Sequence, residues 1–374
     1  ERFAEHIWER FGPDGEPGIP GHPEIELALV KLCAATGESR WRDLARLFVD
    51  RRGRAPHWFE VEAAERGEAA GKGRKLSYCQ SHRPVREVDT IEGHAVRALY
   101  LLAGMVDLGG DDSTLAEAAR RWWRNAVEQR MYITGAFGSH HAGEIFTHDF
   151  DLPNREAYAE TCAGIAGALV ARRLLGREAR GPDGDVLERC LYNGMLAGLS
   201  IDGEHYYYAN PLLVQPGIDN FHKGYQAPED IDLRRPRWYG CACCPPNIAR
   251  VLASLGGYVA DVDESGLDLH LYVGGRFDHA GWTLRIEGDY TWKGKVAILV
   301  DAAPAGNRRL RLRLPAWRTR DTIRLNGEST AYGREDGYAV IQREWRSGDC
   351  LDCDFGISAR RCFADPRIAD DANR

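Results

Sequence analysis

The sequence predicts a multidomain α + β protein: an (α/α)6 toroid of helical hairpins over residues 1–260, followed by an antiparallel β-sandwich over residues 261–374. Apolar residues recur at helical spacing up to about residue 260, and from Leu267 onward they alternate with polar residues. A third observation is a weak internal repeat, in which a polar or sulfur-bearing residue starts a small-residue helix roughly every 70 to 80 residues.

The helical region divides into pairs of apolar or amphipathic helices. The expected pairs are residues 22–36 with 39–53, 90–110 with 113–132, and 157–176 with 185–200, and residues 243–262 begin a fourth. The repeated helix starts are His22, His94, Cys162 and the Cys243–Cys244 pair, which a ring of hairpins would point at one central cavity. Since only about four inner helices are visible, we expect a six-hairpin ring to need chain before residue 1.

The C-terminal region reads as strands separated by turn signals. The expected strands lie within residues 267–275, 282–292, 295–302, 309–317, 321–328 and 338–345, and residues 201–213 suggest a small ribbon inserted in the helical part. We expect the sandwich to continue beyond residue 374. A chain limited to these 374 residues would expose apolar helix faces, so we expect it to aggregate or to be inactive.

Composition excludes some classes of partner. The net charge of -7 argues against nucleic acid as the main partner, because such proteins carry a basic surface. No apolar run approaches the roughly 20 residues that span a bilayer. The ten cysteines are too sparse for a disulfide scaffold in a chain of this length. The sequence leaves the oligomeric state open, with a homodimer as one option.

The stretch YGCACCPPNIAR, residues 239–250, carries the most unusual chemistry. Thiolates suit zinc and a carboxylate can complete a tetrahedron, so Cys243 and Cys244 together with Glu160 and Cys162 are candidate zinc ligands. The two prolines that follow the pair are tolerated in the first turn of a helix, which places the thiols at a helix N-terminus. Two alternatives remain open from the residues alone: a closed structural zinc site, and a disulfide between Cys162 and one of the pair.

A loop rich in glycine, histidine and acids precedes this ligand set in the chain. Glu144 lies there, sixteen residues before Glu160, and a carboxylic acid beside a thiolate cluster suggests acid/base work next to a sulfur nucleophile. Taken alone, Glu144 reads as a solvated loop acid. His22 and His94, each at a helix start after glycine, could be capped structural imidazoles.

The motifs together resemble a known family. The segments GIPGHPEIELALVKL, GHAVRALYLLAG, YITGAFGSHHAGEIF, AYAETCAGI, DVLERCLYNGMLAGLS and CACCPPNIARVLASLGGY are similar to those of glycoside hydrolase family 127, the β-L-arabinofuranosidases. The resemblance implies a helical toroid followed by β-sandwich domains, a zinc ion and a retaining mechanism. It implies Cys243 as nucleophile, Glu144 as general acid/base, a zinc site of Glu160, Cys162, Cys243 and Cys244, and sugar contacts at His22, His94, Glu188 and Tyr208.

The sequence thus favours a zinc-dependent retaining glycosidase that releases L-arabinofuranose from β-L-arabinofuranosides. One alternative is a lyase or epimerase on the same toroid, because that scaffold hosts several sugar chemistries. Another is a carbohydrate-binding protein with a structural zinc site. Because the mechanism needs reduced thiols, we expect a cytoplasmic location.

Overall fold

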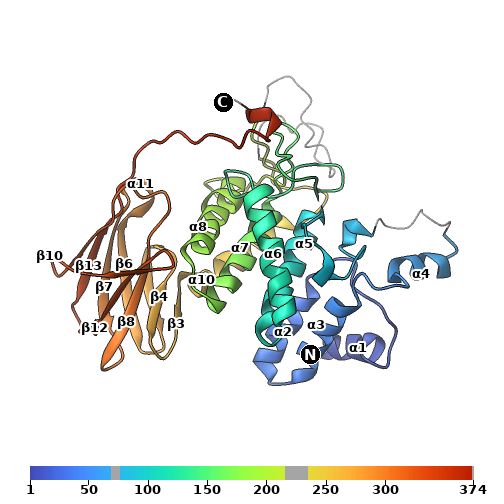
Figure 1. The fold of residues 1–374 in the computed structure, drawn as a ribbon, viewed down its shortest axis with the longest axis horizontal. Helices are drawn as coiled ribbons and strands as arrows, with labels where there is room; N and C mark the ends of the chain where they lie inside the picture. Colours follow the sequence, from blue (N-terminus) through green and yellow to red (C-terminus); the bar gives the residue numbers. More distant parts are fainter. Residues whose placement is uncertain (69–75, 215–234, 373–374) are drawn as a thin grey trace. The chain divides into compact units, whose positions relative to one another are not determined.

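The computed structural model describes residues 1–68, 76–214 and 235–372, and it contains two compact units (Figure 1). The helical unit comprises Glu1–Arg173, Arg189–Ile248 and Phe363–Arg374, and the β-unit comprises Leu174–Glu188 and Ala249–Cys362. The domain boundary expected at residues 260 and 261 stays a prediction.

The first helices of the chain include the two expected hairpins, over residues 22–53 and 90–132. They are α1 (Arg2–Phe11), α2 (Ile25–Thr36), α3 (Ser39–Arg51), α4 (Trp58–Glu65), α5 (Ala95–Leu108) and α6 (Ser113–Gln129). Helix α2 packs against α3 and α5, and α5 packs against α6. The amphipathic pattern of α6 explains its place at the surface, because it buries Leu115, Ala118, Ala119 and Trp122 on one face. Helix α5 is apolar almost all round and is almost fully buried.

Helix ends follow from local sequence. Gly37 stops α2 in a left-handed conformation with φ of 76°, which glycine adopts without a steric penalty. Asp112 caps α6, because its side chain accepts a hydrogen bond from the Leu115 N–H at 3.0 Å.

The remaining helices are α7 (Thr161–Arg177), α8 (Gly181–Arg189), α9 (Cys244–Ala253), α10 (Gly256–Val259) and α11 (Tyr290–Lys293). The helix expected over residues 185–200 is only partly regular, since a π-helical turn at Cys190–Met195 and a 3-10 turn at Leu196–Gly198 follow α8. This irregular segment passes close to α7: a Cβ added to Gly164 would lie 2.8 Å from the Gly194 carbonyl oxygen. The close approach requires glycine at position 164.

A short two-stranded sheet lies in the helical unit. Strand β1 (Gly93–His94) pairs antiparallel with β2 (Ile145–Phe146), so that His94 lies opposite Ile145. The ribbon expected at residues 201–213 is reduced to single bridges in the described residues, one of which joins Leu199 to Tyr206.

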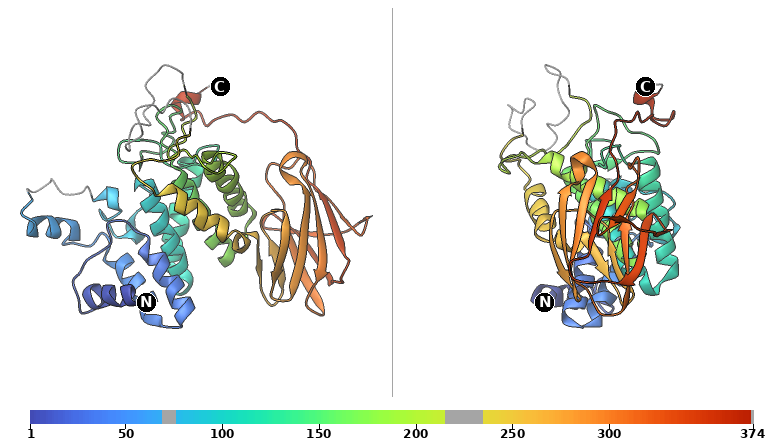
Figure 2. Two further views of the ribbon diagram at one scale, coloured as in Figure 1. Left: turned by 180° about the vertical axis from the view of Figure 1, so that it is seen from behind. Right: turned by 90° about the vertical axis from the view of Figure 1, so that its left-hand side faces the viewer.

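The β-unit holds two sheets, seen from further sides in Figure 2. One has the order β10-β9-β13-β7-β6-β5 and the other β11-β12-β8-β4-β3. The strands are β3 (Ala260–Val262), β4 (Gly266–Leu269), β5 (Gly275–His279), β6 (Trp282–Asp289), β7 (Lys295–Ala302), β8 (Asn307–Arg313), β9 (Thr322–Leu325), β10 (Glu328–Ser329), β11 (Gly333–Glu335), β12 (Tyr338–Glu344) and β13 (Cys350–Asp354).

Two details of the sheets differ from the sequence prediction. Strands β4 and β8 run parallel, whereas we expected antiparallel pairing throughout. Strand β3 begins at Ala260, inside the stretch expected to be helical, because its residues pair with β4 in register from Ala260 opposite Leu269. The alternating pattern identifies which side chains face inward, but it contains no information on strand direction or partner.

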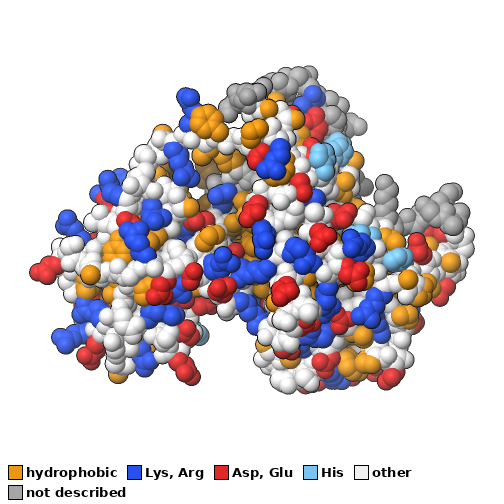
Figure 3. Space-filling view, viewed as in Figure 1, with side chains coloured by type: hydrophobic (Ala, Val, Ile, Leu, Met, Phe, Trp, Pro, Cys, Tyr) orange, Lys and Arg blue, Asp and Glu red, His pale blue; other side chains and the backbone are white. Residues whose placement is uncertain are grey.

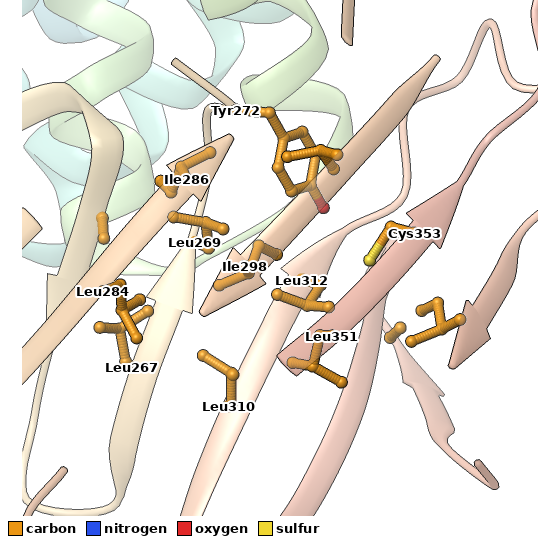
Figure 4. Close-up of a cluster of buried hydrophobic side chains, with 14 of the residues drawn as sticks. Leu267, Leu269, Tyr272, Leu284, Ile286, Ile298, Leu310, Leu312, Leu351 and Cys353 are labelled. Carbon is orange, nitrogen blue, oxygen red and sulfur yellow. The ribbon is translucent and has the colours of Figure 1, made fainter. Parts of the chain in front are cut away.

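Alternate residues of the strands form the core of the β-unit (Figure 4). Strand β7 shows the expected alternation, with Val296, Ile298 and Val300 buried between more exposed neighbours. Leu284, Ile286, Leu310, Leu312 and Leu351 from neighbouring strands belong to the same cluster.

The visible surface mixes charges of both signs. Lys and Arg side chains are interspersed with Asp and Glu on the face drawn in Figure 3, with apolar side chains scattered singly or in small groups. Among the described residues, no helix has the length and apolar character that a membrane crossing requires.

Candidate active site

The cysteine pair lies at the start of a helix, as its sequence predicts. Helix α9 begins at Cys244, and Pro245 and Pro246 occupy its first turn. Asn247, in the same turn, donates a hydrogen bond of 2.7 Å to the Tyr100 hydroxyl on α5, which attaches this end of α9 to the core of the helical unit. Glu160 directly precedes α7, and Cys162 is the second residue of that helix. Two helix starts therefore meet at the thiols.

The four candidate ligands converge on one point. The sulfur of Cys162 lies 3.6 Å from those of Cys243 and Cys244, the sulfurs of Cys243 and Cys244 are 3.7 Å apart, and Glu160 Oε1 is 3.6 Å from the Cys243 sulfur. Zinc–sulfur bonds of about 2.3 Å in a tetrahedron separate the ligand atoms by roughly 3.8 Å, close to these distances. All ten cysteines are free, so the disulfide alternative for Cys162 is not found.

The donor set also fits zinc by its charge. Oε2 of Glu160 is buried and has no hydrogen-bond partner among the described residues, and Glu160 itself is 2% exposed. Burial, and then the nearby Glu144 carboxylate, raise the pKa of Glu160, while hydrogen bonds from Cys162 and then Cys244 lower the pKa of the Cys243 thiol. In the part of the chain that the structure describes, the hydrogen bonds of these three thiols and the carboxylate involve no cationic side chain, and a divalent cation would supply the missing positive charge.

Glu144 lies beside this cluster. The side chain is buried, and the residue has φ of 56°, a left-handed conformation that is uncommon outside glycine. Its Oε1 accepts a hydrogen bond of 2.9 Å from the Tyr158 hydroxyl, and its Oε2 lies 2.7 Å from Nε2 of His94. The Glu144 backbone carbonyl accepts from the Ala95 N–H at 2.9 Å, which connects the loop to the start of α5.

Glu160 joins the two groups of side chains. Ligand atoms of His94, Glu144 and Glu160 lie within 4.8 Å of one another, and Glu160 also contacts Cys243. The Glu144 carboxyl group and the Cys243 thiol therefore both lie close to the Glu160 carboxylate. This arrangement can supply an acid, a nucleophile and a cation site within one small volume.

Two further predicted sugar-contacting residues, Tyr208 and His22, lie near His94 and the residues around it. Tyr208 is buried, and its ring lies 5.9 Å from the ring of Tyr158, whose hydroxyl bonds Glu144. The ring of His22 is 6.0 Å from the ring of His94 in an edge-on arrangement, and His22 remains exposed.

Glu188 is placed differently. It belongs to the β-unit, where Oε1 accepts a hydrogen bond from Trp317 Nε1 at 2.8 Å and Oε2 accepts from the Tyr290 hydroxyl at 2.6 Å and from Arg313. Both oxygens of Glu188 thus have partners within that unit. Its role as a sugar contact stays a prediction.

Two residues of the site were not identified from the sequence. Tyr158 bonds Glu144, and Tyr239 packs its ring 5.7 Å from Tyr208 and 5.1 Å from Tyr206. A signal existed for Tyr158, because it lies two residues before Glu160 in a non-helical segment, and such spacing can direct two side chains to the same side. Tyr239 is recognisable only through its packing.

Comparison with known proteins identifies the family of the chain. The family model described as the β-L-arabinofuranosidase GH127 catalytic domain matches residues 1–257, and the model of the GH127 middle domain matches residues 266–357. The chain belongs to glycoside hydrolase family 127. The resemblance seen in the sequence motifs, and the fold class of a helical catalytic domain followed by antiparallel sheets, are confirmed.

Relatives of the GH127 chain carry informative names. A non-reducing end β-L-arabinofuranosidase from Bifidobacterium longum subsp. longum is 37% identical over 392 aligned positions, which cover 100% of this chain and 58% of the relative. The crystal structure of a GH127 β-L-arabinofuranosidase from Geobacillus stearothermophilus T6 matches with a TM-score of 0.91 and 39% identity, over 99% of this chain and 59% of that one. A second solved GH127 β-arabinofuranosidase matches with a TM-score of 0.85 and 32% identity, over 99% and 57% of the two chains.

Proposed function

We propose that this GH127 protein is a retaining glycosidase that releases L-arabinofuranose from the non-reducing end of β-L-arabinofuranosides. Cys243 is the nucleophile and Glu144 the general acid/base. The observation that carries the proposal is that Glu160 lies close to both the proposed nucleophile and the proposed acid. Its Oε1 is 3.6 Å from the Cys243 sulfur, and its ligand atom lies within 4.8 Å of those of Glu144 and His94. The names of the relatives support the sugar and the linkage.

Glu160, Cys162, Cys243 and Cys244 would hold a zinc ion. The buried, unpartnered Oε2 of Glu160 and the three close sulfurs support this assignment. When bound, zinc would keep these thiols deprotonated, which makes sulfur a nucleophile at neutral pH.

The first step uses both side chains at once. The Cys243 sulfur attacks the anomeric carbon and forms a carbon–sulfur bond, while the bond from that carbon to the leaving oxygen breaks. Glu144 gives its proton to that oxygen, so the aglycone leaves as a neutral alcohol and Glu144 becomes a carboxylate. Buried surroundings suit this exchange, because Glu144 is only 4% exposed and few water molecules can compete for its proton.

The second step returns both groups to their starting states. The Glu144 carboxylate takes a proton from a water molecule, whose oxygen attacks the anomeric carbon as the carbon–sulfur bond breaks. Sulfur leaves as a thiolate and free arabinofuranose forms. Two displacements at one carbon restore its original configuration, so the product keeps the β anomeric configuration.

The need for reduced thiols also bears on location. All ten cysteines are free in the structure, and oxidation of the ligand set would remove the nucleophile. We infer that the protein works in a reducing compartment, for which the cytoplasm is the simplest choice.

The test combines metal content, turnover and stereochemistry. The purified protein, with its zinc measured, is given an aryl β-L-arabinofuranoside, and the first-formed sugar is observed by proton NMR. The proposal expects about one zinc per chain and initial release of the β anomer. Initial release of the α anomer contradicts the sulfur-nucleophile mechanism. Sugar binding without turnover would instead favour a carbohydrate-binding protein, in which four protein ligands form a closed structural site.

A further inference from the structure

The two oxygens of Glu144 have different neighbours. The Tyr158 hydroxyl donates to Oε1 at 2.9 Å, and Nε2 of His94 lies 2.7 Å from Oε2. Tyr158 and Glu144 are each 4% exposed, so water does not compete strongly for Oε1. The carboxyl group is therefore held by its two ends, and a rotation that exchanged the oxygens would break both contacts.

The backbone that carries Tyr158 is held in an unusual conformation. Ala159 has φ of 44°, although it has a Cβ. Its N–H donates to the Gly138 carbonyl at 2.8 Å and its own carbonyl accepts from Asn210 Nδ2 at 3.0 Å, while the Tyr158 carbonyl accepts from the Asn210 N–H at 3.0 Å. Left-handed backbone at a non-glycine residue persists where surrounding bonds enforce it, and such residues cluster at functional sites.

We propose that Tyr158 is a positioning residue for Glu144. The Tyr158 hydroxyl donates to Oε1, so that Oε2, the oxygen beside His94, carries the exchanged proton. The inference rests on the proposed role of Glu144 as general acid/base. A protonated carboxyl group has one O–H and one carbonyl oxygen, and an oxygen that accepts from a phenol is the carbonyl oxygen.

The role predicts a dependence on the leaving group. Removal of the Tyr158 hydroxyl leaves the Glu144 carboxyl group held only at Oε2, by His94, so its proton can lie on either oxygen, and only one of the two is aimed at the leaving oxygen. A poor leaving group such as phenoxide needs that proton to depart, whereas dinitrophenoxide departs almost without it. A purely structural defect would slow both substrates by the same factor.

The experiment compares Tyr158→Phe with Tyr132→Phe in the zinc-loaded protein. Tyr132 is the matched control, because it is also a buried tyrosine whose hydroxyl donates one hydrogen bond, to the Pro153 carbonyl at 3.0 Å. We expect Tyr158→Phe to lower kcat/KM by about 10-fold or more with phenyl β-L-arabinofuranoside and by less than about 3-fold with the dinitrophenyl substrate. Tyr132→Phe should leave the ratio of the two substrates unchanged.

A second comparison distinguishes a positioning role from a general folding defect of the Tyr158→Phe variant. If Tyr158 acts through Glu144, then adding Tyr158→Phe to Glu144→Gln should not lower the rate of the first step further. Equal losses with both substrates, the same change of ratio in Tyr132→Phe, or a further loss in the double variant would overturn the positioning role. If Glu144→Gln itself shows no preference for the better leaving group, the acid role of Glu144 fails, and with it the proposed function.

Discussion

Glu160 contacts Cys243 through one carboxylate oxygen and leaves the other oxygen buried without a partner. Oε1 is 3.6 Å from the Cys243 sulfur, and Oε2 has no hydrogen bond within the described residues. A carboxylate is stable in such a place only if a cation or a proton compensates its charge. The relationship therefore connects the proposed metal site to the proposed nucleophile.

Cys244→Ser should remove most of the zinc. Cys244 is fully buried and belongs to the four-donor group, and a hydroxyl is a much weaker zinc ligand than a thiolate. We expect the parent protein to hold about one zinc per chain and the variant well under half of that, as measured by elemental analysis after dialysis. Cys33→Ser is the control, because it makes the same chemical change at a half-buried thiol on α2. Equal zinc in all three proteins would contradict the proposed ligand set.

Arg313 should be the most sensitive position of the β-unit. Its guanidinium is fully buried and pairs with Asp185 and Glu188. Arg313→Met leaves two carboxylates without their cation and should lower the free energy of unfolding by about 3–5 kcal/mol.

The control for this change is Arg276→Met, since the Arg276 side chain is 63% exposed in its pair with Asp278. An exposed pair contributes at most about 1 kcal/mol. Urea unfolding followed by tryptophan fluorescence measures both variants. Similar losses of unfolding free energy in the two variants would show that burial does not determine how much the Arg313 ion pairs stabilise the protein.

Much of the fold could be predicted from the sequence, because local patterns determine it. Helical spacing identified the α2–α3 and α5–α6 hairpins, and alternation identified most strands of the β-unit. Pro245 and Pro246 located the start of α9. These features depend on near neighbours in the chain, where periodicity and turn chemistry are informative.

The rest depends on contacts between distant residues. The parallel pairing of β4 with β8 and the bonds of Glu188 to Arg313, 125 residues away, leave no local pattern. The bond between Tyr158 and Glu144 also depends on a loop with left-handed backbone, although the position of Tyr158 two residues before Glu160 was a local signal. The convergence of the cysteines was expected, but the orientation of the acid beside them required three-dimensional information.

Asp112 should make the stability of the helical unit depend on pH. The Leu115 N–H, followed by the Arg86 guanidinium, lowers the pKa of Asp112 well below its usual value. A lowered pKa means that the folded state favours the carboxylate, so this stabilisation is complete above the usual pKa of about 3.9 and is lost as the pH falls below it.

Asp112→Ala should therefore cost about 1 kcal/mol at neutral pH, since it removes the cap of α6. The difference from the parent should shrink as the pH falls below about 4. Asp112→Asn keeps an oxygen that can accept from Leu115 and should lose less. Urea unfolding at a series of pH values measures all three, and a difference that grows toward low pH would contradict the assignment.

Covalent trapping tests the central claim most directly. Glu144→Gln lacks both the acid and the base, so a dinitrophenyl β-L-arabinofuranoside should still react with sulfur but the intermediate should persist, because nothing activates water. Intact-protein mass spectrometry followed by peptide mapping should find one arabinosyl group, on Cys243. Cys243→Ser, with its zinc content measured alongside, should form no adduct with any substrate. An adduct on Glu160 or on any residue other than Cys243 would contradict the account.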